Sequence, residues 1–362
     1  MLCLGIETSC DETAVALVRD GRLVGQKLAT QIDVHAVFGG VVPEIASREH
    51  LRVLPTLFRE LMEESGHAPE DIDAVAVARG PGLLGALLIG VSFAKALSLS
   101  CNARLVGVNH LWAHLLAPGL ERSLPFPALG LLVSGGHTHT YRIDSPVEFE
   151  LLGKTLDDAA GEAFDKVAKT LNFPYPGGKH VDELAQETEP DRKLFPRAFI
   201  DNPSLDFSFS GLKTAVAVHV QKHPEVVLPR MDDVDGASAL GALLPDAREH
   251  VARICASFNW SVADTLRIKV ERALKKTGHM KGLVVAGGVA ANTMIRETMA
   301  DLAQRYGLDL VLPGPALCTD NASMIAYSGW LMAELGLQHD LNLEAVPRGR
   351  VVPMDWHTRK AG

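Results

Sequence analysis

The sequence is poor in cysteine, and its cysteines follow no metal or redox motif. Cys3, Cys10, Cys101, Cys255 and Cys318 are odd in number and far apart, without a C-x-x-C pair. A disulfide-stapled secreted fold and a zinc ribbon both require closely spaced, paired cysteines, so this pattern excludes them. A reducing cytosol is the compartment that fits it.

The sequence also lacks the apolar segments that lead a protein into or across a membrane. Its first residues, MLCLGIETSCDET, contain no basic stretch and reach Glu7 almost at once, unlike a secretory signal peptide. The longest apolar run, residues 83–99, is interrupted by Lys95 and falls short of the ~20 residues that a membrane span needs. We therefore expect a cytoplasmic protein with no membrane contact.

An excess of positive charge is missing as well. The chain has 35 Lys and Arg residues against 44 Asp and Glu residues, which gives a net charge of −9. This balance argues against a protein that coats nucleic acid through its overall charge, but it allows a local basic patch. Basic residues gather along a predicted helix and in the tail: Arg267, Lys269, Arg272, Lys275, Lys276, Lys281, Arg348, Arg350, Arg359 and Lys360. They indicate either a surface for a phosphate backbone or an ordinary solvated helix face.

The length of 362 residues and the hydrophobic content of 47% predict about two domains, each with its own core. Strands are predicted at 2–7, 13–18, 22–27, 72–78, 105–108, 128–133, 137–143, 148–152, 282–286 and 308–312. Helices are predicted at 44–64, 84–99, 157–171, 212–221, 247–276 and 321–334. A strand, a polar or glycine turn and two further strands occur twice, at 2–27 and 128–152.

This repeated pattern predicts an α/β protein with the two-lobed ASKHA fold, which is actin-like and sugar-kinase-like, and an active site in the interlobe cleft. We expect one lobe at 1–108, completed by the C-terminal helix at about 321–345, and the other at 109–320. The stretch 224–248 contains three prolines and no sustained hydrophobic period. We expect it to be a mobile surface insertion.

The segment GVNHLWAHLL, residues 107–116, is mostly apolar but holds two histidines four residues apart. On a helix, His110 and His114 would share one face, which is the helical half of many metal sites. The same spacing also occurs on buried helices whose histidines bind nothing. The zinc peptidase motif H-E-x-x-H needs Glu directly after the first histidine, and this chain has Leu111 there, which argues against that class.

Any metal site would need a third ligand from elsewhere in the chain. Asp320, just before the last predicted helix, and Asp11, between the first two predicted strands, are candidates. Each has an ordinary alternative role, because Asp320 could be a helix N-cap and Asp11 a turn residue. Two histidines with carboxylates and an open position would suit iron, zinc or manganese.

Three glycine turns follow or join predicted elements: LLVSGGHT (131–138), YPGG (175–178) and VVAGGVAAN (284–292). Backbone N–H groups in such turns can hold phosphate, although each turn alone is unremarkable, and no Walker A sequence is present. Asp165 and Asp182 could bind ribose hydroxyls, and Lys213 could face a phosphate. The alternatives are an ion pair of Asp165 with Lys169 and a solvated Lys213.

Together these segments resemble one family over nearly the whole chain, and in family order. The motifs are GIETSCDET (5–13), PEIASREH (43–50), GPGLLGALLIGVSFAKAL (80–97), NHLWAHL (109–115), LLVSGGHT (131–138), GEAFDKVAK (161–169), YPGG (175–178), FSFSGLKTA (207–215), AGGVAANT (286–293) and CTDNASMIA (318–326). They are similar to the tRNA N6-adenosine threonylcarbamoyltransferases of the bacterial TsaD type, formerly described as O-sialoglycoprotein endopeptidases.

The resemblance implies transfer of a threonylcarbamoyl group from L-threonylcarbamoyladenylate to N6 of adenosine 37 in tRNAs that read ANN codons. It implies one divalent metal per subunit, iron or alternatively zinc, on His110, His114 and Asp320, with Asp11 as a further carboxylate. The positions matching those that hold the adenylate are Leu132, Val133, Ser134, Gly135, Gly136, Asp165, Gly178, Asp182 and Asn292. The implied partners are tRNA, a TsaB-like paralogue and a TsaE-like ATPase.

The chain departs from the family pattern in three places. Bacterial members commonly have H-M-E-G-H where this chain has H-L-W-A-H, so Trp112 and Ala113 replace Glu and Gly. YPGG is followed by Lys179 and His180 where proline is common, and the stretch 224–248 is longer than expected. Both histidines remain, so these changes affect local packing more than metal binding.

The implied reaction is acyl transfer to a poor nucleophile, because the adenine amine delocalises its lone pair into the ring. Asp11 or Glu12 is the candidate general base, and the 134–136 turn the candidate phosphate site. Three rival functions are an ASKHA kinase or ATPase, a metallopeptidase, and a nucleotide-binding scaffold without activity. A kinase would need Mg²⁺, for which a pair of histidines is a poor site.

Overall fold

The computed structural model describes residues 1–38, 40–174, 177–228 and 245–356. The chain forms two compact units, each built on one five-stranded sheet. The first unit comprises Met1–Leu124, Ser145–Glu148 and Pro313–Gly362, and the second unit comprises Pro125–Asp144 and Phe149–Leu312. The predicted boundary at 108/109 differs from this division, because the histidine segment belongs to the first unit.

The sheet of the first unit has the order β3-β2-β1-β4-β5. Its strands are β1 (Leu2–Glu7), β2 (Glu12–Arg19), β3 (Arg22–Thr30), β4 (Ala74–Gly80) and β5 (Arg104–Asn109). β2 pairs antiparallel with β1 and β3, whereas β4 pairs parallel with β1 and β5. The helices of this unit are α1 (Ile32–Ala36), α2 (Pro43–Ser65), α3 (Leu84–Cys101), α4 (His110–Leu116) and α11 (Ala322–Glu334).

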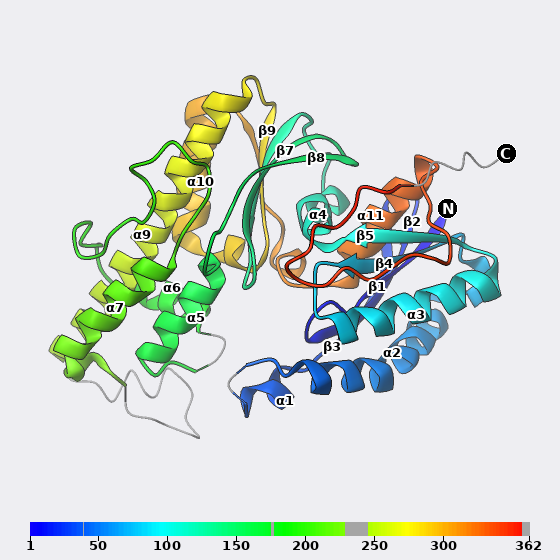
Figure 1. The fold of residues 1–362 in the computed structure, drawn as a ribbon, viewed down its shortest axis with the longest axis horizontal. Helices are drawn as coiled ribbons and strands as arrows, with labels where there is room; N and C mark the ends of the chain where they lie inside the picture. The colour runs from blue at the N-terminus through cyan, green and yellow to red at the C-terminus, as the bar shows by residue number, and fades with distance from the viewer. Residues whose placement is uncertain (39, 175–176, 229–244, 357–362) are drawn as a thin grey trace. The chain divides into compact units, whose positions relative to one another are not determined.

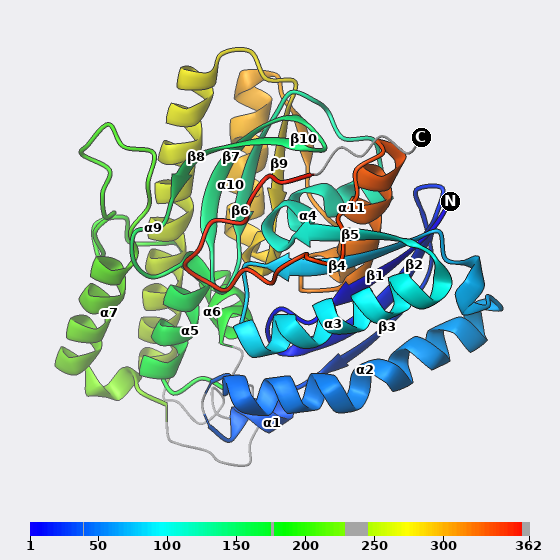
Figure 2. The ribbon, with the colours of Figure 1, turned by 45° about the vertical axis from the view of Figure 1, so that its right-hand side comes forward.

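Side chains of this sheet alternate between two cores, as the period of a strand requires. Leu4 and Ile6 pack with the apolar residues of α2 and α3, while Cys3 packs with Met324 and Ile325 of α11. Figure 1 and Figure 2 show α2 and α3 on one side of this sheet and α11 on the other. Because both faces are covered, β1 and β4 are buried along their whole length.

α11 approaches the sheet closely because Gly5 has no side chain. A Cβ atom on Gly5 would lie 2.4 Å from the backbone nitrogen of Ala326 and 2.5 Å from the carbonyl oxygen of Ala322. Only glycine allows a helix backbone to lie this close to a strand. The contact fixes the start of α11, and therefore the position of the residues just before it.

The sheet of the second unit has the order β10-β9-β6-β7-β8. Its strands are β6 (Ala128–Val133), β7 (Thr138–Ser145), β8 (Glu148–Lys154), β9 (Gly282–Ala286) and β10 (Asp309–Val311). β6 pairs antiparallel with β7 and parallel with β9, so this sheet repeats the topology of the first one. The helices are α5 (Ala160–Thr170), α6 (Gly178–Ala185), α7 (Ser210–Lys222), α9 (Pro245–Thr277) and α10 (Thr293–Tyr306).

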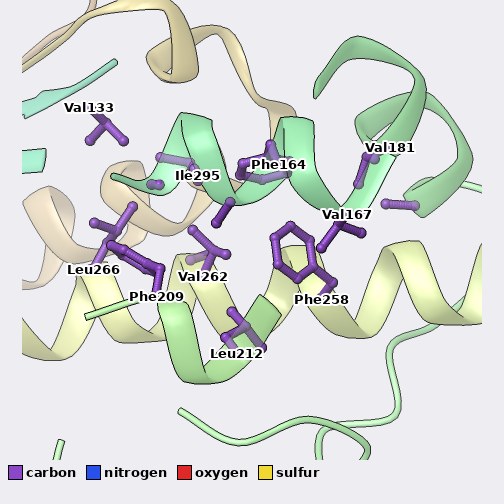
Figure 3. Packing of buried hydrophobic residues seen from close by; sticks show 14 of the residues in the cluster. Val133, Phe164, Val167, Val181, Phe209, Leu212, Phe258, Val262, Leu266 and Ile295 are labelled. Atoms are coloured by element: carbon purple, nitrogen blue, oxygen red, sulfur yellow. The ribbon is translucent and has the colours of Figure 1, made fainter. Parts of the chain in front are cut away.

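The helices of the second unit share one large hydrophobic core with the sheet. Figure 3 shows Phe164 of α5 and Phe258 of α9 packed together, with Leu212 of α7 close by. The two phenylalanine rings meet edge to face, with centroids 5.0 Å apart. Val133, at the end of β6, belongs to the same core. The end of β6 is therefore held by packing from several helices.

The predicted helices and strands agree closely with those observed. The ten strands lie where the sequence predicts them, and the helices begin and end within a few residues of the predicted bounds. α1, α6 and α10 were not predicted; α1 and α6 are short, whereas α10 has 14 residues and follows the 286–288 glycine turn and a short 3-10 helix. Of the stretch 224–248, residues 229–244 lie outside the described residues, so the predicted insertion is not described there.

Among the described residues, one helix is long and apolar enough to cross a membrane by length and composition alone. It is α3 (Leu84–Cys101), and a third of it is buried in the structure. Its small residues Ala86, Gly90 and Ala94 lie on the buried side. A helix that packs against a sheet in a protein core passes the same test, so this finding is weak.

Candidate metal centre and substrate site

α4 brings the two histidines of the sequence motif to one place in the first unit. The helix begins directly after β5, where Asn109 caps it by accepting a hydrogen bond from the backbone N–H of Leu111. All seven of its residues are buried. The rings of His110 and His114 meet edge to face with centroids 4.8 Å apart. The local sequence therefore fixes both imidazoles on one rigid, buried element.

Asp320 completes a set of three possible ligands. Its Oδ1 lies 3.0 Å from Nε2 of His114 and 3.5 Å from Nε2 of His110. The alternative role as a helix N-cap belongs instead to Asn321, whose side chain accepts the N–H of Met324 at the start of α11. The carboxylate of Asp320 is thus directed to the histidines.

Glu7 and Ser9 orient His110 from its other ring nitrogen. Nδ1 of His110 lies 3.0 Å from Oε2 of Glu7 and 3.3 Å from Oγ of Ser9. A carboxylate only accepts hydrogen bonds, so Nδ1 carries a proton, and Nε2 is the ring nitrogen that faces Asp320. A carboxylate on the outer nitrogen of a metal-binding histidine is the usual arrangement that fixes such a ligand.

The charges around these side chains are strongly coupled. Burial alone would lower the pKa of His110, but the carboxylates of Asp320 and Glu7 raise it well above its usual value. Burial would raise the pKa of Asp320, but His110 and His114 hold it well below its usual range. Burial, Asp320 and Asp11 raise the pKa of Glu12 to about 9. The imidazoles and carboxylates are thus electrostatically coupled in a buried place, where several carboxylates close together would favour a bound cation.

The residues present fit a divalent transition metal. Two imidazole nitrogens and one carboxylate oxygen, all within 4.8 Å of one another, form the donor set of His110, His114 and Asp320. Such a mixed set suits iron, zinc or manganese better than magnesium, which prefers oxygen ligands. Nδ1 of His114 is buried without a hydrogen-bond partner among the described residues. The ring of His114 can therefore make one more polar contact than the protein gives it.

Asp11 and Glu12 lie at the start of β2 and belong to the same unit as the histidines. Asp11 is nearly buried, and its side chain shares a hydrogen bond with Glu12. The carboxylate of Glu12 lies within electrostatic reach of Asp320, Asp11 and Glu7. His50 supports the adjoining loop, since its Nε2 lies 2.9 Å from the carbonyl oxygen of Cys10.

The predicted adenylate-binding residues all lie in the second unit. Leu132 and Val133 end β6, and Ser134, Gly135 and Gly136 form the turn to β7. The N–H of Ser134 donates to the carbonyl of His137 at 2.8 Å, so part of this turn is an ordinary hairpin. The start of α5 abuts the turn, because a Cβ on Gly161 would lie 2.7 Å from Cα of Gly135.

The two predicted ribose-binding carboxylates hold other parts of the second unit together. Asp165 accepts the N–H of Gly177 at 3.2 Å, and burial raises its pKa. Asp182 accepts the backbone N–H of Thr293, at 3.0 Å, one residue after Asn292. Asn292 itself is the N-cap of α10. Asp165 therefore fixes the Gly177–Gly178 turn rather than pairing with Lys169, and Asp182 joins α6 to α10.

A second glycine turn lies against the first. Gly287 follows β9 with a positive φ of 93°, and a Cβ there would lie 2.5 Å from the carbonyl oxygen of Val133. The 134–136 turn and the 286–288 turn are thus neighbours at the ends of β6 and β9.

Lys213 forms an ion pair with Asp158 at 2.9 Å, so it has a protein partner for its charge.

An expectation from the sequence that no strand-linked G-x-G-x-x-G is present is wrong, because residues 80–85 have this pattern, from the end of β4 into the start of α3. In dinucleotide-binding proteins these glycines make room for a pyrophosphate. Here the room is filled by the chain itself. A Cβ on Gly80 would meet the carbonyl oxygen of Val346, and one on Gly82 would meet that of Ser9. The glycines serve internal packing.

Several of the clustered basic residues on α9 have structural roles. Arg267 pairs with Asp264 at 2.7 Å and with Glu271 at 3.1 Å. Lys269 and Arg272 donate to backbone carbonyl groups of residues 199–204. These interactions favour the solvated or structural interpretation of this helix face over a phosphate-binding one. Arg359 and Lys360 lie outside the described residues.

Comparison with known proteins identifies the family. The TsaD family model, described as tRNA N6-adenosine threonylcarbamoyltransferase, matches residues 22–327. The chain belongs to the TsaD family. The family predicted from the sequence motifs is therefore confirmed.

Several curated relatives of this TsaD chain have the same name as the family, and each matches this chain over nearly its full length. The tRNA N6-adenosine threonylcarbamoyltransferase of Maridesulfovibrio salexigens is 63% identical over 356 residues, which cover 98% of this chain and 99% of the relative. That of Nitratidesulfovibrio vulgaris is 60% identical over 364 residues and covers 100% and 99%. That of Lawsonia intracellularis is 53% identical over 356 residues and covers 98% and 99%.

Solved structures show the fold of this TsaD protein. Component A of (R)-2-hydroxyglutaryl-CoA dehydratase from Acidaminococcus fermentans matches with a TM-score of 0.51 and 16% identity, covering 92% of this chain and 99% of its own. The activator of 2-hydroxyisocaproyl-CoA dehydratase from Clostridium difficile matches with a TM-score of 0.50 and 15% identity, covering 93% and 97%. The predicted ASKHA fold is confirmed.

Sequence reasoning on this TsaD chain did not assign Glu7 or Ser9 a role. A signal was present for Glu7, since a lone acidic residue ends the otherwise apolar strand LCLGIE. A buried charge needs a partner, so such a residue marks a polar site. Trp112, which replaces the usual Glu of the family, is buried and lies 5.8 Å from Trp356 between ring centroids. Trp112 therefore packs against the C-terminal segment of the first unit.

Proposed function

We propose that this chain transfers the threonylcarbamoyl group from L-threonylcarbamoyladenylate to N6 of adenosine 37 in tRNAs that read ANN codons. The products are N6-threonylcarbamoyladenosine (t6A) in tRNA and AMP. The observation that carries this proposal is the convergence of His110, His114 and Asp320 in a chain of the TsaD family. Relatives of 63% and 60% identity that are named for this activity support it.

The proposed reaction forms one bond and breaks one. N6 of adenine attacks the carbamoyl carbon, the bond from that carbon to the phosphate oxygen breaks, and AMP leaves. One proton must be removed from the amine. The enzyme therefore needs a polarised carbonyl, a site for the leaving phosphate and a base.

We assign the metal to Nε2 of His110, Nε2 of His114 and a carboxylate oxygen of Asp320, with Asp11 as a further carboxylate. The ion is iron, with zinc as the alternative, at one per subunit. When bound, it supplies Lewis-acid polarisation of the threonylcarbamoyl carbonyl or the phosphate. Glu7 keeps His110 in the tautomer that offers Nε2.

We assign the adenylate to the second unit's glycine turns. Backbone N–H groups of the 134–136 turn, other than that of Ser134, which donates to His137, would face the phosphate, and the packing of α5 and the 286–288 turn around this turn supports the assignment. The remaining residues of this proposed site are Leu132, Val133, Asp165, Gly178, Asp182 and Asn292. Asp165 and Asp182 would act mainly by holding the Gly178 turn and the start of α10 in place.

Asp11 or Glu12 would accept the proton from N6. Their position supports this role, since the carboxylate of Glu12 lies within electrostatic reach of Asp320 and the side chain of Asp11 shares a hydrogen bond with Glu12. The proposed partners are tRNA, a TsaB-like paralogue and a TsaE-like ATPase, as the family resemblance implies. Such an enzyme works in the cytoplasm, where its tRNA substrate is found.

The deciding experiment is depletion of the protein in its own cells, followed by analysis of nucleosides from total tRNA. The expected result is loss of threonylcarbamoyladenosine, restored by the wild-type gene but not by a gene carrying His114→Ala. A matched control gene carrying His279→Ala, at an exposed histidine, should restore it fully. An unchanged nucleoside profile after depletion would overturn the proposal.

A second experiment separates the transferase from the rival kinase. Purified protein with its partners is supplied with L-threonylcarbamoyladenylate and unmodified tRNA, without ATP. Formation of t6A and AMP is expected under these conditions. A protein that instead consumed ATP and phosphorylated a small hydroxyl compound, leaving the tRNA unchanged, would be a kinase.

A further inference from the structure

Three histidines outside the proposed active centre gather at one point of the second unit. His219 lies in the last turn of α7, His223 follows its end, and His250 lies near the start of α9. Their ligand atoms lie within 4.8 Å of one another, and the three ring centroids are 4.6 to 5.3 Å apart. The sequence signal for this cluster is H-V-Q-K-H at 219–223, a second pair of histidines at a helical spacing.

The distances within the cluster suit a common metal ion. Nε2 of His219 lies 3.1 Å from Nε2 of His250. Two nitrogens bound tetrahedrally to one zinc ion at ~2.0–2.1 Å would be about 3.3 Å apart. The observed spacing is within a few tenths of an ångström of that value, so little movement of the rings is needed.

Glu225 orients the ring of His223 from outside and lies close to the ring of His250. Its Oε1 lies 3.1 Å from Nδ1 of His223 and 3.6 Å from Nδ1 of His250. A proton held on Nδ1 by a carboxylate leaves Nε2 of the same ring free to bind a metal. The carboxylate also supplies a negative charge that offsets part of the charge of a divalent ion.

Packing holds the third ring in place. His219 meets the ring of Phe195 edge to face, with centroids 5.7 Å apart. The side chains of His223 and His250 are 40% and 26% exposed, so an ion and a water molecule can reach them. The cluster therefore combines preorganised nitrogen ligands with an open side, which is the arrangement of a three-histidine metal site.

We propose that His219, His223 and His250 form a second metal site, which binds a divalent transition metal of the zinc type with Glu225 as the carboxylate that orients the ligands. Three imidazoles favour zinc, nickel or copper over magnesium and calcium. The ion links the end of α7 to the beginning of α9. This site shares no residue with the proposed centre at His110, His114 and Asp320.

The test counts zinc ions per chain in the full-length protein. Metal-free protein, prepared with a chelator, is titrated with Zn²⁺ by calorimetry, and bound zinc is measured after dialysis. Wild-type protein is expected to bind two zinc ions per chain. The variant His110→Gln/His114→Gln, which lacks the first centre, is expected to bind one ion through the second site.

Variants of the second site give the matching half of the test. In the His110→Gln/His114→Gln background, His223→Gln or His250→Gln is expected to weaken zinc binding at least about 100-fold. Glu225→Ala should weaken it about 10–100-fold, as expected for a carboxylate that orients a ligand. His279→Gln, at an exposed histidine of the same unit, is the matched control and should leave binding unchanged.

Cobalt provides a second readout that does not depend on activity. Co²⁺ bound to the second site in the His110→Gln/His114→Gln background should give the visible absorption of a tetrahedral ion, and His250→Gln should abolish it. Circular dichroism checks that each variant is folded. A His110→Gln/His114→Gln variant that binds no zinc ion, or a His250→Gln variant in the same background that keeps the second ion, would overturn the proposal. Neither result would bear on transfer to tRNA, because no activity is measured.

Discussion

At the scale of single residues, the first centre depends on side chains that other residues hold in place. Asn321 caps α11, which leaves the carboxylate of Asp320 available to His110 and His114. Glu7 holds the outer nitrogen of His110. A ligand set of this kind is rigid before the ion arrives, so less ordering is needed on binding.

Glu7 should therefore control metal affinity without touching the metal. Glu7→Gln removes the charged acceptor of Nδ1 and allows the wrong tautomer of His110. We expect about 10–100-fold weaker binding of Fe²⁺ or Zn²⁺ at the first centre. Competition with a chromophoric chelator measures this, and Glu63→Gln, at an exposed residue of α2, is the control. Unchanged affinity in Glu7→Gln would remove Glu7 from this role.

Asp11 should matter for transfer more than for substrate binding. Asp11→Ala is expected to abolish formation of threonylcarbamoyladenosine in tRNA, while binding of the adenylate survives because its proposed site lies in the second unit. Single-turnover assays and equilibrium binding of a non-hydrolysable adenylate analogue separate the two effects. Asp33→Ala, at an exposed position of α1, should behave as wild type. Activity retained in Asp11→Ala would exclude Asp11 from the mechanism.

At the scale of helices and strands, close packing decides where the ligands lie. The approach of α11 to β1 at Gly5 sets the position of Asp320, two residues before the helix starts. The 134–136 turn is likewise set by the start of α5 and by the 286–288 turn. In both units, glycines allow the backbone segments that carry the proposed site residues to pack against each other.

Gly5→Ala should disturb both stability and the first metal centre. The added methyl group would overlap the backbone of α11, and we expect a loss of about 1–3 kcal/mol in the free energy of unfolding. Displacement of α11 should also weaken metal binding, because Asp320 would move away from the histidines. Urea denaturation and chelator competition measure the two effects. Gly40→Ala, where a Cβ would meet nothing within 4 Å, should change neither.

His139, on β7, should make the protein sensitive to mild acid. Burial, with a smaller contribution from Lys154, lowers its pKa from 6.5 to about 4. Between these pH values the unfolded chain binds a proton that the folded chain does not, so stability falls as the pH drops from 6.5 towards 4. Above pH 6.5 the effect is absent. His139→Gln should remove up to about 3 kcal/mol of this acid-dependent loss.

The measurement is urea denaturation of wild type and His139→Gln at a series of pH values between 7 and 4. The stability difference between the two proteins should change in favour of the variant as the pH falls. His279→Gln, at an exposed histidine, is the control and should run parallel to wild type. A difference that does not vary with pH would show that His139 titrates normally.

At the scale of the whole molecule, two units with the same strand order carry different parts of the proposed site. The proposed metal ligands and the proposed base lie in the first unit, whereas the proposed adenylate residues lie in the second. Each unit has its own hydrophobic core. The net charge of −9 indicates that a tRNA substrate is recognised through local contacts rather than overall attraction.

Because each unit has its own core, we expect a substitution in the first centre to affect the stability of the first unit only. Asp320→Asn, compared with wild type in the presence of metal, should speed hydrogen exchange in α4 and at the start of α11. Exchange in β6, β9 and α9 should be unchanged, because their core shares no residue with the first centre. Hydrogen exchange with mass spectrometry measures this, and Asp301→Asn, at an exposed residue of the second unit, is the control. Faster exchange throughout the second unit would contradict it.

Much of this protein is determined by local sequence. The apolar runs of β1, β4, β6 and β9 and the long period of α9 predict their own elements, because a strand or helix is decided largely by the alternation of nearby side chains. The spacing of His110 and His114 likewise requires only one helical turn. The repeated strand pattern at 2–27 and 128–152 was enough to predict the fold class, since it sets the opening of both sheets.

The tertiary structure decided the contacts between distant segments, which no local sequence pattern contains. Asp320 had two possible roles until Asn321 was found to cap α11, because a cap and a ligand differ only in what the carboxylate faces. Glu7 hydrogen-bonds to a partner more than a hundred residues away, and Gly80 and Gly82 pack against Val346 and Ser9. His219 and His250 meet only because α7 and α9 pack in the same core. Contacts between distant segments depend on how whole elements pack, and a sequence read along its length does not contain that information.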